Sequence, residues 1–282
     1  TGVQTCALPI FLDARHALRL DGERDEVRLD AARQQAVVVL RAGEGSELAL
    51  ARDRGGRIDL GVGNDTVEFA SDMSSADTVQ GDIGTDVLTY NDTTTASGTE
   101  LDNVYDIERV VVTGTGINLT LTDSVFSATA GSGVGSDATI DASGGTGLTL
   151  NATNESVSDL LIIGTGGVDS VTLGGGSDAV SLGGGNDYVN ATKASDDSIN
   201  LGGGNDTVVF GSEVNASDTI QGGTGDVDVL TYTDLTSMTG DELNKAFDMD
   251  RVIVVDQGKI VADGPRERIM QALAAGRIAR AS

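Results

Sequence analysis

The chain has 282 residues, of which 39 are glycine and 3% aromatic, and it contains no tryptophan. This composition argues against an ordinary globular core and favours stacked glycine-rich coils. The formal net charge of -26 excludes nucleic acid and anionic membrane surfaces as natural partners, because like charges repel.

The N-terminal region divides into two parts. Residues 1–10, TGVQTCALPI, resemble a translated sequencing-library adapter and are left out of the fold prediction. Residues 11–59 alternate apolar and charged positions in short runs separated by glycine turns, a pattern typical of strands. We predict a β-rich N-terminal cap over 11–59, since the open end of a stacked fold exposes strand edges. The only histidine, His16, is interpreted as structural or exposed.

A long internal duplication follows. Residues 60–113 align with residues 201–255 when one residue is inserted near Val227. Each copy contains glycine turns with aspartate, a polar loop, a helix-prone segment such as 100–106 and a β-branched strand such as 110–113. We therefore predict two related cassettes, a first over 60–113 and a second over 164–249.

Residues 114–163, between the cassettes, lack the aspartate turns. They keep short apolar runs, at Ile117–Leu121, Ala138–Asp141, Leu148–Asn151 and Leu160–Ile163, which predict the rungs of a β-solenoid spacer. Threonine and asparagine flank the apolar positions. A threonine-rich face can bind ice or glycan, but ordinary β-propensity explains the same composition more simply.

The most regular stretch, residues 173–210, repeats every nine residues. It reads LGGGSDAVS, LGGGNDYVN, the looser ATKASDDSIN and then LGGGNDTVVF. Glycines permit tight turns in which one backbone approaches another, and each x-Val-x is a very short strand with one side chain pointing inward. Two units make one coil of about eighteen residues, so unit n stacks on unit n+2.

This stacking predicts contacts between aspartates of alternate units. Asp169 is expected to meet Asp187, which meets Asp206, which meets Asp228, while Asp65 meets Asp86 in the first cassette. Carboxylates and glycine carbonyls would then surround gaps between coils, and such gaps suit a hard cation that takes six or more oxygen ligands. Calcium fits best. The predicted metal-binding residues are Asp65, Gly81, Asp86, Gly164, Gly166, Asp169, Gly174, Gly176, Asp178, Gly183, Gly185, Asp187, Gly202, Gly204, Asp206, Gly222 and Asp228.

Some units depart from the pattern. Those that end near Asp77, Asp197 and Asp218 lack the glycine turn, and we expect them to stack without binding a full ion. Of the 44 acidic residues in the chain, the 60–240 segment holds twenty-seven, against two basic residues. A flexible glycine-rich linker is the alternative interpretation, but linkers do not keep aspartate and valine in register with glycine.

The unit G-G-x-G-x-D-x-U-x, with U a large apolar residue, resembles the nonapeptide repeat of the RTX (repeat-in-toxin, hemolysin-type) calcium-binding proteins. The best units are 81–89, 164–172, 173–181, 182–190 and 201–209, and leucine replaces the first glycine at several of them. The resemblance implies an all-β fold, a parallel β-roll or β-solenoid with several Ca2+ ions. It also implies an extracellular or cell-surface location and a type I secretion exporter as partner.

The C-terminal tail, residues 250–282, resembles the end of the ATPase subunit of type I secretion ABC transporters, and the chain is interpreted as a chimera of neighbouring secretion genes. We predict a short helix of positive character over Arg266–Arg280. The chain has no G-x-x-x-x-G-K-[ST] motif, so nucleotide binding is not expected.

Catalytic motifs are poor, and no enzyme is predicted. A single histidine excludes an H-E-x-x-H zinc site, and no G-x-S-x-G motif is present. One cysteine, Cys6, permits no intrachain disulfide, and no apolar run approaches the roughly 20 residues of a membrane span.

The hypothesis is a calcium-binding RTX repeat module of a secreted or surface bacterial protein that folds on calcium outside the cell. The alternative is a structural adhesin or surface-layer-like protein whose spacer rungs bind a surface partner, with calcium giving only rigidity.

Overall fold

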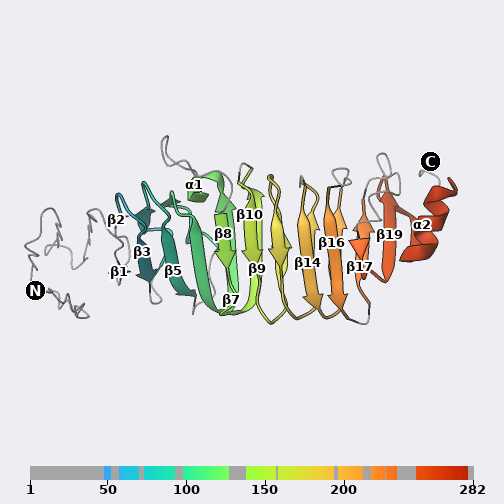
Figure 1. Cartoon of the computed structure of the whole chain (residues 1–282), viewed down its shortest axis with the longest axis horizontal. Helices are drawn as coiled ribbons and strands as arrows, with labels where there is room; N and C mark the ends of the chain where they lie inside the picture. The colour runs from blue at the N-terminus through green and yellow to red at the C-terminus, as the bar shows by residue number, and fades with distance from the viewer. Residues whose placement is uncertain are drawn as a thin grey trace, which may run out of the picture.

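The computed structural model describes residues 48–51, 57–69, 73–92, 98–126, 138–156, 158–193, 196–211, 217–225, 227–233 and 246–278. They form a long parallel β-solenoid whose strands lie side by side along one axis, with a helix at the C-terminal end (Figure 1). The predicted fold class is confirmed. The adapter-like segment, His16 and most of the predicted N-terminal cap lie outside the described residues.

Most of the strands are short, as the nine-residue period requires. In chain order the elements are β1 Leu48–Ala51, β2 Arg57–Asp59, β3 Thr66–Phe69, β4 Thr78–Gln80, β5 Val87–Asp92, β6 Val104–Tyr105, β7 Arg109–Thr122, α1 Asp123–Phe126, β8 Ala138–Asp141, β9 Thr146–Asn154, β10 Leu160–Ile163, β11 Ser170–Thr172, β12 Ala179–Ser181, β13 Tyr188–Ala191, β14 Ser198–Gly203, β15 Thr207–Phe210, β16 Thr219–Thr224, β17 Val229–Tyr232, β18 Ala246–Phe247, β19 Arg251–Asp256, β20 Lys259–Pro265 and α2 Arg266–Ala274.

From β1 to β19, strands alternate between two faces of the coil and pair in parallel with a strand one coil away. One face runs through β1, β3, β5, β7, β8, β10, β12, β14, β16 and β18. The other runs through β7, β9, β11, β13, β15, β17 and β19. The long strand β7 joins both faces, while β2, β4 and β6 form a separate three-stranded sheet.

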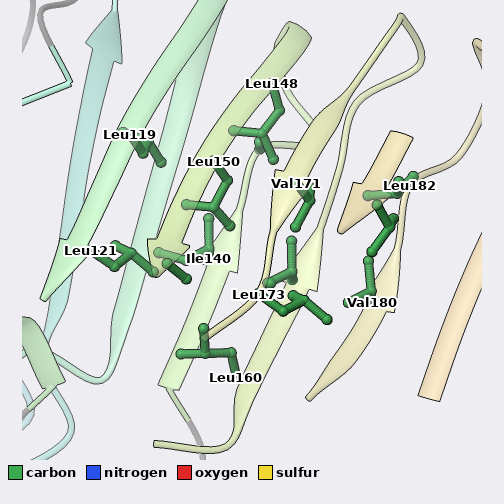
Figure 2. Close-up of a cluster of buried hydrophobic side chains, with 14 of the residues drawn as sticks. Leu119, Leu121, Ile140, Leu148, Leu150, Leu160, Val171, Leu173, Val180 and Leu182 are labelled. Carbon is green, nitrogen blue, oxygen red and sulfur yellow. The ribbon is translucent and has the colours of Figure 1, made fainter. Parts of the chain in front are cut away.

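The core is a set of apolar columns between the two faces. In-register pairing stacks one inward side chain of each rung on the next, and a single column runs through Val67, Leu88, Val110, Ile140, Ile162, Val180, Ile199 and Ile220. All of these side chains are buried. Figure 2 shows leucine, isoleucine and valine side chains of successive rungs between the faces, among them Ile140, Leu150 and Val171. A narrow core of this kind needs few aromatic residues, which agrees with the composition.

The four apolar runs predicted in the spacer are all strands. Two of them coincide with β8 and β10, a third lies within β9, and the fourth lies within β7. Strand β7 also contains the β-branched segment 110–113 that closes the first cassette. The solenoid therefore passes from the first cassette through the spacer with continuous pairing from β5 to β7 and from β7 to β9.

The duplication seen in the sequence is also a structural one. Strands β3 and β5 correspond to β15 and β17, and the pairing offset grows by one residue between the copies, from Thr66 opposite Val87 to Thr207 opposite Val229. The residue inserted near Val227 accounts for this difference. The two copies lie on different faces of the coil, since β3 belongs to the first face and β15 to the second.

The helix-prone segment 100–106 is not a helix, and the expectation was wrong. Residues 100–103 form a turn, and the next two residues form β6, which pairs with β4. Leu101, Val104 and Ile107 are fully buried, so the spacing that suggested a helical face serves a turn followed by a strand. Packing against the adjacent rung overrides the local helical preference. Within the described residues the helices are α1 and α2.

The C-terminal tail begins as one more rung. Strand β19 pairs in parallel with β17, and β20 then returns antiparallel to β19. Helix α2 begins at Arg266 as predicted, ends at Ala274 and buries Ile269 against the core. Among the described residues, no helix has the length and apolar character needed to cross a membrane.

Candidate metal centre

The sixth position of each repeat lies at the entrance to a strand, and its aspartates form a ladder along the second face. The backbone N–H of Asp169 donates to Oδ1 of Asp187 at 2.8 Å, that of Asp187 to Asp206 at 2.8 Å, and that of Asp206 to Asp228 at 2.9 Å. These partners are 18, 19 and 22 residues apart. The predicted stacking of unit n on unit n+2 is confirmed.

A second ladder follows the first face. The N–H of Asp178 donates to Oδ1 of Asp197 at 3.0 Å, and that of Asp197 donates to Asp218 at 2.7 Å. The units at Asp197 and Asp218, which lack glycine turns, therefore stack in line with the others, as predicted.

The first cassette contains a shorter ladder of the same kind. Asp65 donates its N–H to Oδ1 of Asp86 at 2.8 Å, and Asp86 donates to Oε2 of Glu108 at 2.5 Å. In the second cassette, Asp228 donates to Oδ2 of Asp250 at 3.0 Å. Each cassette thus closes on an acidic side chain that belongs to no nonapeptide unit, and sequence reasoning missed both residues because they fall outside the motif.

The second carboxylate oxygen of these aspartates is the notable group. The ladder aspartates are at most 2% exposed. Within the described part of the chain, the Oδ2 atoms of Asp86, Asp178, Asp187, Asp197 and Asp206 are buried and accept no hydrogen bond. A buried carboxylate oxygen without a donor is costly, so each such atom suits a cation ligand.

Burial raises the pKa of these carboxyl groups. The pKa of Asp178 rises to about 8, mainly through burial and further through the charges of Asp197 and Glu155, although the N–H of Leu160 opposes the rise. Burial likewise raises the pKa of Asp86 and Asp197 to about 7 and that of Asp187 to about 6. Each of these groups is also close to another carboxylate, which adds to the rise.

Glycine is required where the turns of adjacent coils touch. Gly204 has φ 143°, and a Cβ there would collide with the carbonyl oxygen of Gly185 in the preceding coil. Gly185 has φ 140° and would bring a Cβ within 2.9 Å of Asp187 Oδ1. A backbone hydrogen bond also joins adjacent turns directly, because Gly185 donates its N–H to Gly203 O at 2.8 Å.

The other predicted glycines occupy three kinds of place. Gly81, Gly164 and Gly222 lie directly against an Oδ2 atom, of Asp86, Asp169 and Asp228 respectively. Gly174, Gly176, Gly183 and Gly202 lie against carbonyl oxygens of the preceding coil. Gly166 has no neighbour within 4 Å of an added Cβ, so packing does not require glycine there.

Asparagine side chains form a further ladder that sequence reasoning missed. In each case the asparagine Oδ1 accepts a backbone N–H at 2.9 Å. Asn64 accepts from Thr85, Asn186 accepts from Asn205, and Asn205 accepts from Val227. The asparagine side chains therefore accept backbone N–H groups of the following coil, whereas the aspartate side chains accept backbone N–H groups of the preceding coil. The recurring Gly-Asn-Asp order was the signal that could have revealed this ladder.

The donor atoms available at the coil gaps are all oxygens. No three His, Cys, Asp or Glu side chains gather as a metal cluster in the described residues, so backbone carbonyl oxygens would have to complete the ligand set around any acidic side chain. Carboxylate plus carbonyl oxygen is the ligand set that calcium prefers, whereas zinc and copper favour nitrogen and sulfur. The partnerless Oδ2 atoms beside close-packed glycine turns fit this ion.

Comparison with known families agrees with this chemistry. Residues 161–189 and 192–213 match the sequence model of the RTX calcium-binding nonapeptide repeat (4 copies). The chain carries RTX calcium-binding repeats. The matched residues include Asp169, Asp178, Asp187 and Asp206 but none of the first cassette. No curated protein and no solved structure matches the chain, and the resemblances proposed for residues 1–10 and 250–282 stay predictions.

Proposed function

We propose that this chain is the calcium-responsive module of a secreted or cell-surface protein, which folds when it meets calcium outside the cell. The observation that carries the proposal is the row of buried Oδ2 atoms that accept no hydrogen bond from any residue the structure describes. The RTX repeats found at 161–189 and 192–213 support the choice of ion. No catalytic role is assigned to the chain.

The ladder aspartates have two tasks in this proposal. Oδ1 fixes the stacking of adjacent coils by accepting a backbone N–H, as in the bond from Asp187 to Asp206. Oδ2, together with carbonyl oxygens of the glycine turns, would hold calcium. The bound ion supplies positive charge to a region that has very few basic residues. Without it, adjacent buried carboxylates repel one another, and the entropy of the glycine turns favours the unfolded chain.

The location of the proposed folding step follows from affinity. Extracellular calcium modules bind with Kd of about 10⁻⁴ to 10⁻³ M. A site in this range would stay empty at cytosolic calcium and fill at millimolar calcium outside, where an ion that binds only the folded form stabilises it by about 0.4 to 1.4 kcal/mol per site at about 1 mM. The chain could then pass unfolded through a type I exporter, the partner that the RTX resemblance implies.

The test is a calcium titration followed by circular dichroism and calorimetry. We expect β-sheet signal to rise cooperatively at millimolar calcium, and magnesium at equal ionic strength to give little change, because magnesium keeps its water shell and demands stricter geometry. A chain that shows the same spectrum in chelator and in millimolar calcium, with no heat of binding, would contradict the proposal.

A further inference from the structure

The coil that precedes the glycine turn 174–176 matches no nonapeptide unit, yet it contributes a buried acid. Glu155 is 0% exposed. Its main-chain oxygen accepts the N–H of Gly175 at 3.0 Å, and its Oε1 accepts the N–H of Ser158 at 2.7 Å. Both bonds fix Glu155 in the turn that stacks directly on the glycine turn of the repeat.

Carbonyl oxygens crowd the same place. A Cβ on Gly174 would collide with the oxygens of Ala152 and Glu155, and one on Gly176 would collide with the oxygen of Ser158. The two backbones can approach this closely only because the repeat places glycine at both positions. Three main-chain oxygens of the preceding coil therefore lie against the turn that leads to Asp178.

Asp178 presents its carboxylate to this coil. Its Oδ1 accepts the N–H of Leu160 at 3.0 Å, while its Oδ2 is buried and accepts no hydrogen bond from any described residue. The side chain is 1% exposed. No lysine or arginine pairs with Asp178 in the described part of the chain.

The repeat motif alone does not supply a partner turn for Asp178. On the same face the next unit is that of Asp197, which has no glycine turn. The carboxylate of Asp178 instead contacts the coil on the N-terminal side, where its Oδ1 accepts the N–H of Leu160. Glu155 and the carbonyl oxygens around it lie in that coil.

We infer that Glu155 and Asp178 together hold a hard divalent cation of the calcium type, with the carbonyl oxygens that line Gly174 and Gly176 as further ligands. This site lies at the junction of spacer and second cassette, and one of its carboxylates belongs to no repeat. The inference rests on the proposed function and extends it to a residue outside the motif. The ion at this junction joins a spacer coil to the first RTX turn on this face.

The test counts the calcium ions linked to folding in the full chain. The slope of the free energy of unfolding against the logarithm of calcium concentration gives that number. We expect Glu155→Gln, which keeps an acceptor for Ser158, to reduce the slope by one ion. Asp178→Asn should remove the same ion, and the double variant should lose one ion and no more. Glu68→Gln, at an exposed strand position, is the matched control and should leave the slope unchanged.

The outcomes separate the possible roles. If Glu155→Gln lowers stability equally at every calcium concentration, Glu155 has a packing role only and the inference is overturned. A double variant that loses two ions overturns it as well. Should Glu155→Gln fail to fold at any calcium concentration, Asp178→Asn decides, and an unchanged slope in that variant overturns the shared site. A wild-type chain with no calcium-dependent slope would instead defeat the proposed function.

Discussion

The spacer rungs and the RTX repeats share the same apolar column but differ in whether a basic side chain pairs with their carboxylates. Ile140 and Ile162 of the spacer stand in register with Val180 of the repeats. The carboxylate of Asp141 in the spacer pairs with Arg109 at 2.6 Å, whereas Asp178 has no basic partner among the described residues. The apolar column alone is enough to fold a rung of the spacer. In the repeats, carboxylates such as that of Asp178 make the folding of a rung depend on a bound cation.

The largest expected effect follows directly from this difference. Removal of calcium with a chelator should abolish protection of backbone amides from hydrogen exchange in β12 to β15, while β8 keeps much of its protection. The repeats lose the ions proposed for them, whereas no ion is proposed at β8. Hydrogen exchange followed by mass spectrometry resolves the two regions. Equal loss of protection in both would show that the solenoid is a single cooperative unit and would remove the contrast.

A core truncation in the spacer should be the next largest effect. Ile140→Ala deletes a fully buried side chain and should cost about 2 to 5 kcal/mol of unfolding free energy. We expect the cost to be independent of calcium, as measured by urea denaturation at two saturating calcium concentrations. Val180→Ala is the counterpart in the repeats. A cost for Ile140→Ala that varies with calcium would mean that the spacer shares the ion dependence.

A glycine substitution separates turns that need glycine from turns that merely contain it. Gly204→Ala should destabilise the chain by at least about 1 to 3 kcal/mol, because φ is 143° and such strained conformations cost that much, before the clash with Gly185 O is added. Gly166→Ala, whose added Cβ meets nothing within 4 Å, is the control and should change stability by less than about 0.5 kcal/mol. Thermal melting in calcium measures both, and similar losses would contradict the assignment of turn contacts.

The last expected effect concerns pH. In the ion-free fold the pKa of Asp178 is raised to about 8, that of Asp86 to about 7 and that of Asp187 to about 6, against about 3.9 in an unfolded chain. The folded form thus binds protons more tightly than the unfolded chain, so in chelator the repeats should be most folded near pH 5 and should unfold as pH rises towards 8. Calcium affinity should change in the opposite direction, because protons and calcium compete for the same oxygens. Melting in chelator that improves from pH 5 to 8 would contradict this.

The repeat period predicted much of the fold. The frame shared by Asp178 and Asp187 was enough to give the stacking of alternate units and the inward valines. The pattern works because each coil contacts only its neighbours, so local spacing determines the tertiary contacts. The spacer strands followed from their apolar runs for the same reason.

The features that the sequence could not reveal are those that depend on the adjacent coil. Glu155 carries no local signature, and its role arises only from the turn stacked against it. Segment 100–106 has helical spacing, but pairing of β6 with β4 decided its conformation. The hydrogen bonds of Asn186 and Asn205 likewise join coils that are 19 and 22 residues apart. A sequence motif shows which residue types recur at each position of the repeat, but it does not show which residues of the adjacent coil contact them.

Strand β20 has a consequence for how the rod ends. Parallel stacking leaves the last rung with a free edge, on which a second molecule could add and continue into a fibre. Here β20 runs antiparallel along β19, with a register shift between Val254 and Val255, and its residues include the charged Lys259 and Asp263. The edge that would otherwise serve as a template is occupied by the chain itself. The second face of the rod therefore ends on a strand supplied by the same chain, which blocks the addition of a further parallel rung at β19.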